Sequence, residues 1–288
     1  MLGAIIGDIV GSIYEWCNIK TKDFPLFQNN CFFTDDTVMT AAVADAVMKG
    51  GTRDDFIDSI KYWGRKYPDC GYGSRFSVWL KYDNRKPYNS WGNGSAMRVS
   101  PCAWVMSTHF CRQTGIWPTN RLAELSAAVT HNHPEGIKGA LAVNDAIFIC
   151  LYRNYLKTLS DDDIDDNGNA RIVEKYKEYI KKHTEKEYGY DLNKTLDEIR
   201  PKYAFNESCQ ETVPQAVTAF LESTDFEDAI RNAISLGGDS DTLAAITGSI
   251  AEAAYGIPDW IRDKALSYLD APLLDVYERW RAYIADKP

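Results

Sequence analysis

Residues 3–11 read Gly-Ala-Ile-Ile-Gly-Asp-Ile-Val-Gly, and this stretch indicates the fold of the chain. Its branched apolar residues recur at helical spacing and continue to Ile13, which predicts a buried helix with Glu15 at its end. Its three glycines recur at every fourth position and form a second, narrow face. Because glycine has no side chain, we expect another helix to pack closely along that face.

Helical periodicity also dominates the rest of the chain, and strand-like alternation is scarce. Thr52 begins a Thr-x-x-Asp capping pattern before an amphipathic run to Lys66. Residues 68–95, rich in glycine, aromatic and polar residues, are predicted to form a long ordered loop. Further helices are expected over 37–49, 96–107, 120–130, 135–158, 171–183, 212–222, 226–236, 241–255, 259–269 and 272–285. The sequence therefore predicts an all-α fold in which residues 1–288 form a single-domain helical bundle.

The composition is that of an ordinary globular enzyme, with 45% hydrophobic and 25% charged residues among 288. The 32 basic residues are outnumbered by 41 acidic ones, which argues against a broad nucleic-acid-binding surface. We expect no signal peptide and no membrane span, because the apolar start lacks a basic region and no apolar run is long enough. Seven scattered cysteines without a Cys-x-x-Cys pair favour a reduced, cytoplasmic protein.

Two short acidic clusters each stand directly before a predicted helix. The first is Thr34-Asp35-Asp36-Thr37, and the second is Asp239-Ser240-Asp241-Thr242 after two glycines. Either cluster alone would serve as a helix N-cap. Each carries one acid more than a cap needs, and four converging carboxylates would repel one another unless cations neutralised them. Because all the donors are hard oxygens, we expect two divalent cations, Mg²⁺ or Mn²⁺, between the clusters.

Residues 89–98, Asn-Ser-Trp-Gly-Asn-Gly-Ser-Ala-Met-Arg, form a second informative stretch. Closely spaced glycines before a helix can bind phosphate oxygens through backbone N–H groups, although an Asn-Gly turn with a helical cap would use the same residues. Trp91 could stack on a ring or serve as a packing anchor. His131 and His133 could bind a metal, but hydrogen bonding at a helix end is favoured for at least one of them.

The acidic segment at 160–170 partly fits a calcium-binding loop. The pattern D-x-D-x-N-G-x5-E is matched by Asp163, Asp165, Asn167, Gly168 and Glu174. Ala170 replaces the larger apolar residue that pairs with a second loop, and the sequence holds no second loop. A solvated connection between two helices is therefore the favoured interpretation.

Taken together, these segments resemble the ADP-ribosylglycohydrolase family, that of dinitrogenase reductase-activating glycohydrolase and its animal relatives. Four ordered motifs carry the resemblance: Gly7-Asp8-Ile9-Val10-Gly11-Ser12 with Glu15, Phe33-Thr34-Asp35-Asp36-Thr37, Gly92-Asn93-Gly94-Ser95-Ala96-Met97-Arg98, and Ser235-Leu236-Gly237-Gly238-Asp239-Ser240-Asp241-Thr242. Thr130-His131 is a weaker fifth. Together they span nearly the whole chain.

The resemblance implies an orthogonal all-α bundle with a two-ion Mg²⁺ or Mn²⁺ centre that binds ADP-ribose. It assigns one ion to Thr34, Asp35, Asp36 and Asp241, and the other to Asp239, Asp241 and Thr242. It assigns substrate contacts to the segment 89–98, which includes Gly94. In that assignment the diphosphate or distal ribose is bound by Ser90, Gly92, Asn93 and His131. Trp91 matches a position that packs on the adenosine.

The resemblance also suggests the chemistry. Glu15 matches a mobile acid of the branch that cleaves serine linkages. We expect the ions to hold the 2″ and 3″ hydroxyls and a water that attacks C1″, while Glu15 or Asp36 manages the proton. The expected substrate is an ADP-ribosylated protein or small ADP-ribosyl conjugate, and a nucleic acid only if it is itself ADP-ribosylated. The acceptor, whether arginine, serine, acetate or a base, stays open.

Two other functions remain open at this point. One is a catalytically silent family member that binds ADP-ribose or has a structural role, although complete acidic motifs weigh against it. The other is a dimetal phosphoesterase, which would cleave the pyrophosphate and leave AMP.

Overall fold

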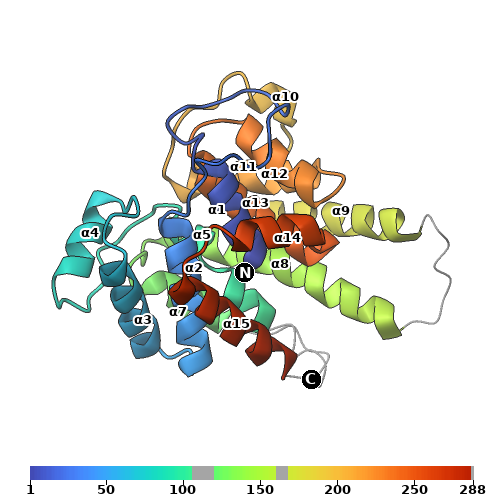
Figure 1. The fold of residues 1–288 in the computed structure, drawn as a ribbon. Coiled ribbons are helices and arrows are strands. Elements are labelled where there is room, and N and C mark those ends of the chain that lie inside the picture. The colour runs from blue at the N-terminus through green and yellow to red at the C-terminus, as the bar shows by residue number, and fades with distance from the viewer. Residues whose placement is uncertain (106–119, 160–167, 287–288) are drawn as a thin grey trace.

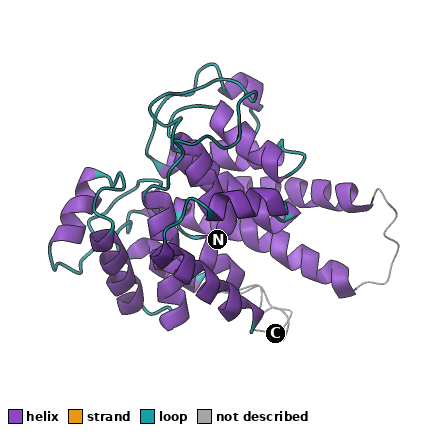
Figure 2. Cartoon of the chain, in the orientation of Figure 1, coloured by secondary structure: helices purple, strands orange, loops and turns teal. Residues whose placement is uncertain are grey.

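The structure is a computed structural model that describes residues 1–105, 120–159 and 168–286. Figure 2 shows helices joined by loops, and these three segments contain no β-strand. An isolated antiparallel bridge joins Gly92 to Ser208. The predicted all-α fold is confirmed. The helices are α1 (Leu2–Gly11), α2 (Asp35–Lys49), α3 (Arg53–Lys66), α4 (Ser74–Lys81), α5 (Gly94–Met97), α7 (Arg121–Ala128), α8 (Pro134–Leu159), α9 (Gly168–Tyr188), α10 (Leu196–Ile199), α11 (Cys209–Leu221), α12 (Phe226–Ser235), α13 (Ser240–Tyr255), α14 (Asp259–Leu266) and α15 (Ala271–Ala285).

Helices α1 and α13 lie side by side at the centre of the molecule (Figure 1). The glycine face of α1 makes this contact. A Cβ atom added to Gly7 would lie 2.0 Å from the carbonyl oxygen of Ala244, and one added to Gly3 would lie 2.1 Å from that of Gly248. The two backbones therefore touch, and the predicted close helix packing is confirmed.

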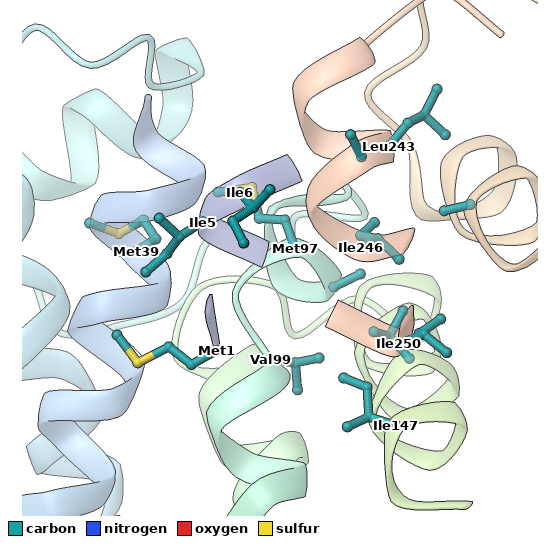
Figure 3. Packing of buried hydrophobic residues seen from close by; sticks show 14 of the residues in the cluster. Met1, Ile5, Ile6, Met39, Met97, Val99, Ile147, Leu243, Ile246 and Ile250 are labelled. Atoms are coloured by element: carbon teal, nitrogen blue, oxygen red, sulfur yellow. The ribbon is translucent and has the colours of Figure 1, made fainter. Parts of the chain in front are cut away.

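The apolar core surrounds this central pair. Figure 3 shows Ile5 and Ile6 of α1 between Met39 of α2 and the side chains of Leu243 and Ile246 on α13. All five side chains are almost completely buried. The same apolar cluster includes side chains from α3, α8, α11, α12 and α15. The start of α2 and the start of α13 are thus both held against α1.

Part of the predicted loop at 68–95 is helical. Helix α4 occupies eight of those residues and buries Phe76, Trp79 and Leu80, which follow helical spacing. Gly71 and Gly73 directly precede this amphipathic run, and its eight residues are too few to give a clear helical period. The helix expected over 96–107 is also interrupted: α5 ends at Met97, and a second helical stretch begins at Ser100. Pro101 in the first turn of that stretch cannot donate a backbone hydrogen bond, which favours a new start there.

Two further expectations concern single segments. Glu15 does not sit at the end of a helix, since α1 ends at Gly11 and the residues after it form turns. The candidate calcium loop falls mainly on 160–167, outside the described residues. Its last candidate ligand, Glu174, forms an ion pair with Lys177 on α9 at 2.9 Å.

Within the described part of the chain, no helix is both long and apolar enough to cross a lipid bilayer.

Candidate active site

The first turns of α2 and α13 meet beside α1, which brings the two acidic clusters together. The hydroxyl of Thr242 donates a hydrogen bond to Oδ2 of Asp36 at 3.1 Å. Oγ1 of Thr34 lies 3.4 Å from Oδ2 of Asp241. Residues more than 200 positions apart in sequence therefore share one small volume, as the surplus acids had indicated.

Asp8 of α1, which was not among the predicted site residues, anchors the start of α2. Its Oδ1 accepts a hydrogen bond from the Thr34 hydroxyl at 2.6 Å, and its Oδ2 accepts from the backbone N–H groups of Thr34 and Thr37 at 2.9 and 3.0 Å. Asp8 is completely buried, and it is absent from the described residues that line the adjacent pocket. It therefore orients Thr34 from behind. A single acid within an otherwise apolar helix was the sequence signal for this role.

The start of α13 is shaped by two glycines and two asparagines. Gly237 and Gly238 have φ values of 68° and 73°, in the left-handed region that glycine adopts most easily. Asn18 binds Gly238 at both its N–H (2.7 Å) and its carbonyl (2.9 Å). Asn93 donates to Oδ2 of Asp239 at 2.6 Å. These contacts hold Asp239 at the edge of the acidic cluster.

The site carries strong like-charge repulsion. Burial and the neighbouring charges of Asp241 and Asp8 raise the pKa of Asp36 well above its usual value. Burial and the charges of Asp239 and Asp8 do the same to the pKa of Asp241. Burial raises the pKa of Asp239 to about 6. Burial, followed by the charges of Asp241 and Asp8, raises the pKa of half-buried Glu15 to about 7. Without a neutralising partner, these acids disfavour one another's ionised forms.

The arrangement fits hard divalent cations. One oxygen each from Asp8, Asp36 and Asp241 lie within 4.8 Å of one another, and so do oxygens of Glu15, Asp239 and Asp241. Oδ1 of Asp36 is buried and has no hydrogen-bond partner among the described residues. An unpartnered carboxylate oxygen in a cluster of hard oxygen donors is what a Mg²⁺ or Mn²⁺ site requires. Asp35 lines the same pocket but belongs to neither group, and burial with the charges of Asp241 and Asp8 raises its pKa.

Apart from Asp8, these acids line a pocket of about 410 Å³. Of the predicted site residues, those that line it are Glu15, Thr34, Asp35, Asp36, Ser90, Gly92, Asn93, Gly94, His131, Asp239, Asp241 and Thr242. Trp91 is not among its described lining residues. The Trp91 ring is half exposed and meets the edge of His133, with ring centroids 5.8 Å apart.

Several lining residues were missed from the sequence. Trp16 and Phe205 stack with ring centroids 5.2 Å apart and line the pocket together with Phe32, and all three are exposed. Arg98 was quoted in a motif but given no role, although its buried guanidinium also lines the pocket. Isolated aromatic residues in loops carry no periodic signal, so only the tertiary structure could reveal Trp16, Phe32 and Phe205.

A family model described as ADP-ribosylglycohydrolase matches residues 1–285. This chain belongs to the ADP-ribosylglycohydrolase family. The match covers α1, α2, α5 and α13, the elements that carry the four motifs, and the resemblance inferred from those motifs is confirmed.

Two curated relatives and one solved structure are distantly similar to this chain. The chain is 27% identical to human "ADP-ribosylhydrolase ARH3" over 318 residues, covering 89% of this chain and 84% of the relative. It is 25% identical to "ADP-ribosylarginine hydrolase Tri1" of Pseudomonas putida, covering 93% and 73%. A solved structure titled "ADP-ribosylglycohydrolase-related protein complex" matches with a TM-score of 0.62 at 21% identity, covering 96% of this chain and 95% of that one. This last likeness supports the fold.

Proposed function

We propose that this chain hydrolyses the glycosidic bond at C1″ of ADP-ribosylated protein side chains or small ADP-ribosyl conjugates and releases ADP-ribose. One observation carries the proposal. The buried acids Asp36, Asp239 and Asp241 line a pocket that is also lined by the glycine-rich segment 92–94. A ligand with ribose hydroxyls at one end and phosphates at the other suits such a pocket. The relatives named ADP-ribosylhydrolase and ADP-ribosylarginine hydrolase support the same reaction class.

The proposal includes two divalent cations, Mg²⁺ or Mn²⁺. Thr34, Asp35, Asp36, Asp239, Asp241 and Thr242 would hold them. When bound, such ions supply positive charge that orients ribose hydroxyls and lowers the pKa of a water molecule. Asp8 would support the site by fixing the Thr34 hydroxyl, and Asn93 would do so by fixing Asp239.

The remaining chemistry belongs to side chains of the chain itself. Glu15 and Asp36 are the acids that we propose manage protons, Glu15 because it lines the pocket beside Asp239 and Asp241 on a loop. The surrounding carboxylates would also stabilise the positive charge that develops on the ribose as the bond to the acceptor breaks. Ser90, Gly92, Asn93, Gly94 and His131 would bind the diphosphate or distal ribose. Trp91, whose ring contacts His133, would pack on the adenosine.

The test is a substrate panel assayed with Mg²⁺ and with Mn²⁺. It comprises ADP-ribosyl-arginine, ADP-ribosyl-serine, O-acetyl-ADP-ribose and ADP-ribosylated DNA, with products identified by mass. We expect ADP-ribose from at least one substrate and loss of that activity after chelation. AMP as the product would favour a dimetal phosphoesterase. Binding of ADP-ribose without turnover of any substrate would favour a silent family member.

Variants connect the activity to the acidic cluster. Asp35→Asn and Asp241→Asn should each abolish turnover and leave the far-ultraviolet circular dichroism unchanged. Asp259→Asn is the matched control, because Asp259 is an exposed acid in the first turn of α14 and should tolerate the change. Full activity in both site variants would contradict the proposal.

A further inference from the structure

His131 occupies a buried position at the edge of the glycine-rich segment. Its Nε2 atom lies 3.6 Å from where a Cβ of Gly92 would be and 3.2 Å from where a Cβ of Gly94 would be. The two glycines therefore leave this face of the ring uncovered toward the pocket, which His131 lines. The described residues give Nε2 no hydrogen-bond partner. Whether this atom carries a proton decides what it offers to a ligand.

A chain of hydrogen bonds behind the ring determines where the proton lies. Nη2 of Arg98 donates to Oγ1 of Thr130 at 2.7 Å, and Oγ1 of Thr130 lies 2.7 Å from Nδ1 of His131. Arg98 can only donate, so Thr130 accepts from it and keeps its own proton for the next bond. Its hydroxyl then donates to Nδ1. If Nδ1 were the donor instead, the hydroxyl proton of completely buried Thr130 would lack a partner.

The same arrangement keeps the ring neutral. Burial, followed by the positive charges of Arg98 and Arg75, lowers the pKa of His131 well below its usual value. Arg98 is itself almost completely buried, and its Nη2 also donates to the Ser126 carbonyl at 2.8 Å. The guanidinium is therefore fixed where it orients Thr130 and opposes protonation of the imidazole.

We propose that Arg98 and Thr130 are positioning residues that hold His131 as the neutral Nε2–H tautomer, so that it presents a hydrogen-bond donor to an oxygen of the ligand beside Gly92 and Gly94. The nature of the ligand rests on the proposed function, with a phosphate or ribose oxygen of ADP-ribose as the acceptor. The tautomer does not depend on it. A neutral donor suits this place because a protonated histidine beside Arg98 would be costly.

The experiment measures the tautomer directly. Long-range ¹H–¹⁵N correlation spectra of the protein labelled with ¹⁵N-histidine distinguish Nε2–H from Nδ1–H rings, and His131→Gln identifies the His131 signals by their loss. We expect a neutral Nε2–H ring with a hydrogen-bonded Nδ1 in the wild type. Thr130→Val, which replaces the hydroxyl by a methyl group of similar size, should shift the Nδ1 signal away from its hydrogen-bonded position. Thr130→Ser should restore it.

Calorimetric titration with ADP-ribose supplies the second measurement. Loss of one oriented donor should raise the Kd of Thr130→Val roughly three- to tenfold, and Thr130→Ser should bind like the wild type. An Nδ1–H ring in the wild type would overturn the proposal whether or not the variants fold. An unchanged Nδ1 signal in folded Thr130→Val would also overturn it. If the spectra agree but the wild type does not bind ADP-ribose, the proposed function fails and the positioning role stands.

Discussion

Replacing Asp36 by asparagine tests the charge balance of the site, because it removes one negative charge and changes the side-chain shape very little. Oxygens of Asp8, Asp36 and Asp241 lie within 4.8 Å of one another. Two unit charges at that separation repel by about 3.5 kcal/mol at an effective dielectric constant of 20. In the cation-free protein the raised pKa values let the cluster take up protons, which relieves part of this repulsion. We therefore expect Asp36→Asn to stabilise the cation-free protein by about 1–2 kcal/mol, or roughly 2–3 °C in Tm for a chain of 288 residues.

Divalent cations should reverse the ranking. The wild type should gain stability in excess Mg²⁺ or Mn²⁺, because binding to the folded state adds to the free energy of unfolding. Asp36→Asn has lost a ligand charge and should gain little, and it should have no hydrolase activity. Differential scanning calorimetry in EDTA and in each metal measures both effects.

The control is an aspartate whose ionised form is stabilised by its surroundings. Asp55 in the first turn of α3 accepts hydrogen bonds from the N–H and hydroxyl of Thr52, which hold the pKa of this exposed carboxyl below its usual value. Asp55→Asn should lower Tm equally in EDTA and in metal. If Asp36→Asn also lowered Tm in EDTA, the charge of Asp36 would be stabilising the start of α2, and the argument from repulsion would be refuted.

Two further predictions concern packing and support of the site. Gly7→Ala should destabilise the protein by about 3 kcal/mol or more, because its Cβ would overlap the carbonyl of Ala244 on α13. Gly73→Ala is the control, because the space around its Cβ is open, and its urea unfolding should be nearly unchanged. Equal midpoints for the two variants would contradict the close contact of α1 and α13. Asn93→Ala should weaken Mn²⁺ binding about tenfold or more, because Asp239 loses the amide that orients it. An unchanged Kd for Mn²⁺ by calorimetry would show that Asp239 needs no such support.

Local pattern was sufficient for much of the fold. The apolar spacing of residues 5–13 and the glycine repeat beside it predicted a buried helix with a close neighbour, and the structure identifies that neighbour as α13. The Thr52 cap and the surplus acids at 35–36 and 239–241 could also be predicted, because caps and charge clusters depend on residues a few positions apart. Where the signal was short, as in α4, or interrupted, as at Pro101, the prediction failed.

By itself, the sequence determined most of the helices, the two acidic helix starts and the family that their motifs indicate. Only the tertiary structure decided that Asp8 binds the start of α2, that the Trp91 ring packs against His133, and that Arg98 reaches His131 through Thr130. The physical reason is the range of the interactions. Helix formation and capping are settled within a few residues, whereas a buried carboxylate or guanidinium acquires its role from whichever backbone and side-chain groups the packed helices place against it.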